Sequence, residues 1–157
     1  MTDNKLQKRF RHEVAHLQMQ MQEKANGIDV VVGTKEDPIV TDSDLIPIKH
    51  YFMDGVYVRE MTMKKGIAVV GAIHKHLHMC FLLTGRITVI NEEETIDHIA
   101  PCFIISTPGI KRVLYAHEDS IWFNTHKNPS NTEDVKQLEK EIVAITYEEY
   151  EEYIKNK

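Results

Sequence analysis

Short β-type segments between frequent turn signals constrain the fold of this chain more than any other sequence feature. From residue 28 to residue 126 these segments are rich in Val, Ile, Thr, Phe and Tyr, and turns such as Thr84-Gly85 and Pro108-Gly109 separate them. Such spacing leaves no room for the helices of βαβ units and predicts an all-β fold, a jelly roll or a closed barrel. The expected strands cover residues 28–32, 56–63, 68–77, 81–90, 95–99, 103–106, 112–115 and 120–126.

Helical patterns flank the β-region on both sides. An N-terminal amphipathic helix is predicted by apolar residues that recur at spacings of four, four, three and four, namely Leu6, Phe10, Val14, Leu17 and Met21. Asn26-Gly27 is a stop signal for this helix. A capping box at residues 130–133 precedes a second helical pattern. The predicted organisation is therefore an N-terminal helix (1–27), a β-barrel (28–128) and a C-terminal helical extension (129–157).

Both helical segments have two interpretations. The N-terminal apolar stripe either packs on the barrel, the commoner origin of such a pattern, or forms the interface of a homodimer. In the C-terminal segment, Tyr147, Tyr150 and Tyr153 recur every third residue among glutamates. They fit a partner-binding edge, but acidic runs are more typical of a solvated helix.

The charge balance and the lack of long apolar runs exclude two classes of partner. The 157 residues hold 19 Lys and Arg against 24 Asp and Glu, a net charge of -5, so no overall positive field attracts nucleic acid. No apolar run approaches the roughly 20 residues that span a bilayer, and we expect no membrane partner. Two cysteines, Cys80 and Cys102, are too few for a disulfide framework and favour a cytoplasmic location.

Three alternating histidines are the strongest chemical signal. His74, His76 and His78 would lie on one face if the segment is a single extended strand. Neutral imidazole is a common ligand of divalent transition metals such as Zn, Mn, Fe or Ni. The sequence therefore predicts a metal site to which His117 or His126, on later strands, adds a further donor. The alternative is an exposed polar edge, but the neighbouring apolar residues argue against it.

This histidine segment resembles the first motif of the cupin superfamily, whose members are single-domain jelly-roll barrels. The motif runs glycine, five residues, His-x-His, three or four residues, Glu, six residues, glycine. In one register His74 and His76 form the His-x-His pair, and Cys80 occupies the glutamate position.

A second register of the motif places the final glycine at Gly85. His78 then occupies the glutamate position and His74 the second histidine position. Ala72 falls at the first histidine position. Both registers remain open from the sequence.

The second cupin motif, Pro-x-Gly-x-x-His, resembles residues 107–112, and Arg112 stands at its histidine position. A guanidinium has no lone pair for a metal but suits a carboxylate or a phosphate. Arg112, with His117, is therefore a predicted binding residue for a small anionic ligand, and a surface charge is the alternative.

Residues 45–127 are also similar to small cupin-like proteins encoded by bacteriophages, a likeness that would place the protein in the host cytoplasm. Two functions follow as hypotheses. The first is a barrel pocket that binds a divalent metal, a small anion or both, with metal-dependent catalysis as one outcome. The second is a non-catalytic phage accessory, virion-associated, ligand-capturing or assembly protein.

One competing motif lies on the predicted N-terminal helix. Residues 12–16, His-Glu-Val-Ala-His, match the H-E-x-x-H pattern in which two histidines bind zinc and the glutamate activates water. Only eleven residues precede it, so no substrate-aligning strand comes first, and chance spacing is the better interpretation. Cys80 and Cys102 are predicted to be inert buried thiols.

Overall fold

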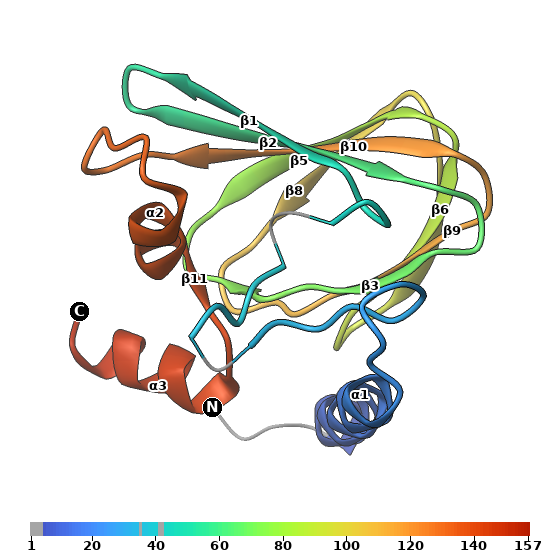
Figure 1. Cartoon of the computed structure of the whole chain (residues 1–157). Coiled ribbons are helices and arrows are strands. Elements are labelled where there is room, and N and C mark those ends of the chain that lie inside the picture. Colours follow the sequence, from blue (N-terminus) through green and yellow to red (C-terminus); the bar gives the residue numbers. More distant parts are fainter. Residues whose placement is uncertain (1–4, 35, 41–42) are drawn as a thin grey trace.

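The computed structural model describes residues 5–34, 36–40 and 43–157, and antiparallel strands make up most of it (Figure 1). In chain order the elements are α1 (Lys5–Glu23), β1 (Ile48–Met53), β2 (Val56–Met63), β3 (Ala68–Val70), β4 (Ile73–His74), β5 (His78–Thr84), β6 (Arg86–Ile90), β7 (Thr95–Ile99), β8 (Cys102–Ser106), β9 (Val113–Ala116), β10 (Ser120–Lys127), α2 (Val135–Ile142), β11 (Val143–Ala144) and α3 (Tyr147–Lys155).

Two antiparallel sheets enclose the main core. One has the strand order β1-β2-β10-β5-β8 and the other β3-β9-β6-β7, while β11 and β4 form a short pair. The first sheet contributes buried Met63, Leu82 and Trp122 to the core, and the second contributes Ile87 and Leu114. The prediction of an all-β jelly-roll barrel with helices at both ends is confirmed. None of the described helices is long and apolar enough to cross a membrane.

Three of the predicted strands differ from the structure at their glycines or turns. Residues 28–32 form no strand, because the side chain of Asn26 accepts hydrogen bonds from the backbone N–H groups of residues 28, 29 and 30. The predicted strand 81–90 is two strands that meet at Gly85, where φ is 83°. A Cβ atom there would lie 2.3 Å from Ser120 Oγ, so the tight turn requires glycine.

The predicted strand 68–77 is divided into β3 and β4, and residues 75 and 76 near its end form a bend. Gly71 at the first break donates its backbone N–H to the carbonyl of Arg112. Strand β1 was not among the predicted strands. The single-strand prediction for the three histidines is therefore wrong, with consequences for the site described below.

Helix α1 packs on the outer side of the four-stranded sheet. Phe10 and Val14 are buried against Val113, with Val70 and Ile90 beside them. Burial of two such side chains stabilises the contact by about 3–6 kcal/mol before ordering costs. The apolar stripe thus packs on the barrel of its own chain, which was the first of the two interpretations; the second was a homodimer interface.

The C-terminal extension begins later than the predicted capping box. The side chain of Asn128 closes the turn at residues 128–132, and Asp134 is the N-cap of α2, accepting from the N–H groups of Lys136 and Gln137. Thr146 caps α3 in the same way through the N–H of Glu149.

The three tyrosines of α3 contact the rest of the chain, so the solvated-helix interpretation holds only for the glutamates between them. The guanidinium of Arg11 lies 4.0 Å from the ring centre of Tyr147. Tyr150 lies against Gly109, and Tyr153 meets the ring of His76 edge-on. Helix α3 is thereby held on the barrel.

Candidate metal centre

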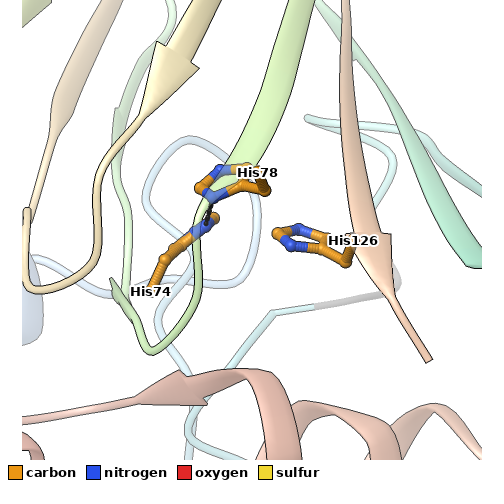
Figure 2. Close-up of side chains that lie close together, drawn as sticks. All are labelled: His74, His78 and His126. Atoms are coloured by element: carbon orange, nitrogen blue, oxygen red, sulfur yellow. Dashed lines mark hydrogen bonds between the residues drawn. The ribbon is translucent and has the colours of Figure 1, made fainter. Parts of the chain in front are cut away.

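Three imidazoles converge inside one end of the barrel. His74 ends β4, His78 begins β5 and His126 lies near the end of β10 (Figure 2). Each can offer a ring nitrogen, and these three atoms lie within 4.8 Å of one another. The ring centres of His74 and His78 are 4.1 Å apart, and those of His78 and His126 are 4.6 Å apart.

The backbone explains why His74 and His78 meet. The bend after β4 reverses the chain, so the two rings stack although four positions separate them. The bend is held because Lys75 donates its N–H to the carbonyl of Ile142, and Gly109 donates to the carbonyl of His74. His126 joins them because β10 lies beside β5 and its alternate residues, Trp122 among them, point inwards.

His76 lies apart from this cluster, contrary to the prediction that it shares the metal site. Its Nε2 atom contacts the backbone carbonyl of Glu141 at 3.2 Å, and its ring lies beside Tyr153. The physical reason is the bend, because the period-two rule that places i, i+2 and i+4 on one face holds only for an unbroken strand.

The hydrogen bonds of His78 determine which ring nitrogen is available. Its Nδ1 atom lies 3.2 Å from the carbonyl of His76 and 3.3 Å from Nδ1 of His74, and in the tautomer that donates to the carbonyl Nδ1 carries the hydrogen. The lone pair is then on Nε2, which is buried and has no hydrogen-bond partner within the described part of the chain. A metal-binding histidine typically donates its other N–H to a carbonyl in this way.

All three imidazoles are held in the neutral form. Burial lowers the pKa of His78 to about 4, helped by the positive charge of Arg112. Burial also lowers the pKa of His74 and of His126 well below the ordinary value, and the mutual repulsion of the rings acts in the same direction. At neutral pH each ring therefore has a lone pair that a metal ion can use.

Arg112 is buried next to the cluster. Its Nη1 atom donates to Ser106 Oγ at 2.6 Å, and Ser106 lies opposite His78 in the β5–β8 pair. Among the described residues Arg112 forms no ion pair, and burial lowers the pKa of its guanidinium. A buried guanidinium without a carboxylate is costly, and an anionic ligand would offset that cost.

A second polar group borders the cluster on the β2 side, and sequence reasoning missed it. Arg59 donates from Nε to Tyr57 Oη at 2.9 Å and forms an ion pair of 2.5 Å with Glu139 of α2. Tyr57 Oη also lies 2.7 Å from His50 Nδ1, within hydrogen-bond distance. The ring of Tyr57 stacks on His126 with 6.0 Å between centres.

A signal for this group was present in the sequence. Tyr57 and Arg59 share the strand face of the core residues Met61 and Met63, so period two predicts that they point inwards. An arginine on the core face of a strand needs a buried partner.

His117, predicted with Arg112 as a ligand-binding residue, lies elsewhere. It is on the face of the four-stranded sheet opposite to buried Ala116, and its Nε2 atom is 2.6 Å from Thr88 Oγ1. Its ring meets Tyr115 edge-on. His117 is two residues after the outward-facing Tyr115 and therefore points to the same side of the sheet. It does not reach the barrel interior.

The remaining sequence candidates form no second site. Cys80 is buried, its Sγ atom contacts Asn124 Oδ1 at 3.1 Å, and burial raises the pKa of its thiol to about 12, as expected of an inert cysteine. Cys102 is partly buried, and burial raises its thiol pKa too. His12 and His16 are exposed on α1, and Glu13 pairs with Arg9, so nothing there completes a zinc site in the part of the chain that the structure describes.

Comparison with solved structures agrees with the cupin fold. Salicylate 1,2-dioxygenase from Pseudaminobacter salicylatoxidans matches at a TM-score of 0.52 with 12% identity, over 59% of this chain and 29% of that chain. A Cupin 2 conserved barrel domain protein from Salinispora arenicola matches at 0.49 with 10% identity, over 71% and 96%. Ectoine synthase from P. lautus matches at 0.49 with 14% identity, over 56% and 67%.

The match to the dioxygenase, with a TM-score above 0.5, shows a shared fold, and its 12% identity leaves the reaction open. No protein-family model matches the sequence, and no curated protein is similar to it in sequence. The fold is that of the cupin superfamily, whereas the likeness to bacteriophage proteins stays a prediction.

Proposed function

We propose that this cupin-like barrel binds one divalent transition metal through His74, His78 and His126. The single observation that carries the proposal is the buried Nε2 atom of His78, which lies in a cluster of three neutral imidazoles without a hydrogen-bond partner among the described residues. A buried polar atom of this kind costs about 1–3 kcal/mol unless something occupies its lone pair. Zn, Mn, Fe and Ni all accept three imidazoles, so the donor set fits the metals expected from the sequence.

We further propose that Arg112 holds a small anion beside this metal. A carboxylate or phosphate that meets the guanidinium would supply the countercharge that the buried side chain lacks. A bound metal with open positions would act as a Lewis acid on such a ligand. Arg112 and Ser106 would orient the ligand, and the low local polarity that keeps the histidines neutral would strengthen these contacts.

A non-catalytic, ligand-capturing protein is the second candidate. The observation in its favour is Arg112, which stands where the cupin motif has a metal-binding histidine. An arginine at this position can bind an anion but cannot coordinate the metal. Both candidates share the metal and anion site and differ in whether the bound anion is converted.

Metal analysis of protein purified without a histidine tag tests the metal site. We expect about one equivalent of metal per chain. After removal of that metal, restoring it at about 100 times its Kd should stabilise the fold by about 2.7 kcal/mol, or roughly 5–10 °C in Tm. Less than about half an equivalent, together with no thermal shift from Zn, Mn, Fe or Ni, would contradict the proposal.

Replacing Arg112 with methionine tests the anion site. Calorimetric titration of the metal-loaded protein with oxalate and with inorganic phosphate is expected to show about 10- to 100-fold weaker binding in Arg112→Met, because a charge-assisted hydrogen bond is lost. Metal content should not change. The matched control is Arg86→Met, which removes an exposed arginine that pairs with Asp97. Equal anion affinities in the two variants would exclude Arg112 as the binding residue.

A further inference from the structure

The outer face of the five-stranded sheet is apolar where it should be polar. An antiparallel sheet with one face on the core normally alternates apolar residues inwards with polar residues outwards. Here the core-facing residues of β5 include Cys80 and Leu82, yet the intervening residues Met79, Phe81 and Leu83 are also apolar. Strand β5 is thus apolar on both faces.

The same pattern continues on the two strands beside β5. On β8, Phe103 and Ile105 point away from the core, and on β10 Phe123 does so. The backbone register places Phe81 opposite both Phe103 and Phe123, and Met79 opposite Ile105. We call this set the outer apolar face: Met79, Phe81, Leu83, Phe103, Ile105 and Phe123.

The outer apolar face is uncovered in the described part of the chain. All three helices lie below the five-stranded sheet in Figure 1, and none of them covers its upper side. Phe103 is 61% exposed, Ile105 58% and Leu83 50%. Ion-paired Lys49 and Glu60 lie to one side, on β1 and β2, and leave the centre of the face without a charge.

We infer that the outer apolar face is the interface of a homodimer, in which two copies of this sheet pack face to face. A standard interface buries about 800 Å² on each partner, of which a little over half is apolar. The exposed parts of Phe103, Ile105, Leu83 and Met79 together amount to on the order of 400 Å², close to the apolar share that such an interface needs.

The geometry of a sheet favours a second copy as the occupant. Every sheet of L-residues has the same hand of twist, and two sheets of equal twist stack with their strands about 30° apart and their side chains interdigitated. A two-fold axis through this face brings each patch against itself. The uncharged centre offers no contact that would select a basic, acidic or nucleic-acid partner.

The position of this interface differs from the one that the N-terminal stripe suggested. The inner part of that stripe, Phe10 and Val14, is already buried on the barrel. Only scattered apolar residues of α1, such as Leu6 and Met19, remain exposed. Single exposed apolar residues are ordinary and form no interface.

Sedimentation equilibrium of wild type and three variants tests the dimer. We expect wild type to have twice the 18.2 kDa mass of one chain. Phe103→Glu should be a monomer, because the two-fold axis would bury two like charges together, and its Kd should rise at least about 100-fold. Ile105→Lys, on the same strand face, should dissociate as well. The matched control Met19→Glu places a charge on an exposed residue of α1 and should remain a dimer.

Thermal unfolding accompanies these measurements, since the monomeric variants must still unfold cooperatively. A monomeric wild type would overturn the inference, including the case in which a different protein covers the face. A dimer that survives both Phe103→Glu and Ile105→Lys, or that Met19→Glu dissociates, would also overturn it, because the interface would then lie elsewhere.

Discussion

Replacing His74 and His78 together with alanine is expected to abolish metal binding while the barrel remains folded. Two of the three clustered ring nitrogens are removed, and loss of even an outer partner of a metal ligand costs about 10- to 100-fold in affinity. We therefore expect more than about 100-fold weaker binding for the double variant, measured by competition with a chromogenic chelator. The fold should persist because neither side chain belongs to the main apolar core.

His76→Ala is the matched control for this prediction. It removes the histidine between the other two, whose Nε2 atom contacts the carbonyl of Glu141 outside the cluster. Its metal affinity should equal that of wild type. If His76→Ala loses the metal and the double variant keeps it, the site is built from different residues. If the metal-free double variant does not fold, His126→Gln provides a second test of the same cluster.

The metal-free protein is expected to lose stability steeply as the pH falls from about 6.5 to about 4. His78 has a pKa of about 4 in the folded state and about 6.5 in the unfolded chain, and the pKa values of His74 and His126 are shifted in the same direction. Between these pH values the unfolded chain binds protons that the folded chain excludes, so protonation favours unfolding.

The size of this effect follows from the number of protons taken up. Each neutral histidine that must become protonated contributes about 1.4 kcal/mol per pH unit, so three give a slope of about 4 kcal/mol per pH unit. Above about pH 6.5 the contribution is fully present and the slope vanishes. Urea unfolding at a series of pH values measures it.

His78→Asn separates the cluster from the rest of the protein in this measurement. The asparagine amide can still donate to the carbonyl of His76 but does not titrate, so the slope should fall by about 1.4 kcal/mol per pH unit. His12→Asn, a change at an exposed residue of α1, should leave the slope near that of wild type. A free energy of unfolding that is constant from pH 6.5 to pH 5 would show that the clustered imidazoles are not held neutral.

Local patterns in the sequence were sufficient for the barrel. The segments 56–63 and 95–99 match β2 and β7 residue for residue. For β2 the reason is that apolar residues alternating between turns favour a strand with one face on the core. Strand predictions were wrong where a side chain takes the backbone N–H groups of the segment or where a glycine breaks the strand. At residues 28–32 the competitor is Asn26, whose side chain takes the backbone N–H groups, and at residue 85 it is a glycine with positive φ.

The candidate site was less accessible to the same reasoning. Proximity of His74 and His78 was expected for the wrong reason, since a bend rather than a shared strand face brings them together. Arg59 was not predicted as a site residue, although its position on β2 places it on the inward-facing side of the strand. The ion pair of Arg59 with Glu139 joins positions 80 residues apart, and no local pattern encodes such a contact.

Patterns between near neighbours in the chain are enough to predict the strand-rich barrel, the helices at its ends and the presence of metal-binding side chains, because hydrophobic period and turn chemistry act locally. The packed fold is needed to show that His126 lies with His74 and His78 while His76 and His117 do not. That choice depends on which strands pair, on where a bend reverses the chain and on which groups are shielded from water. These are properties of the packed barrel, since burial is the main cause that keeps the clustered rings neutral, and packing leaves Nε2 of His78 without a hydrogen-bond partner in the described structure.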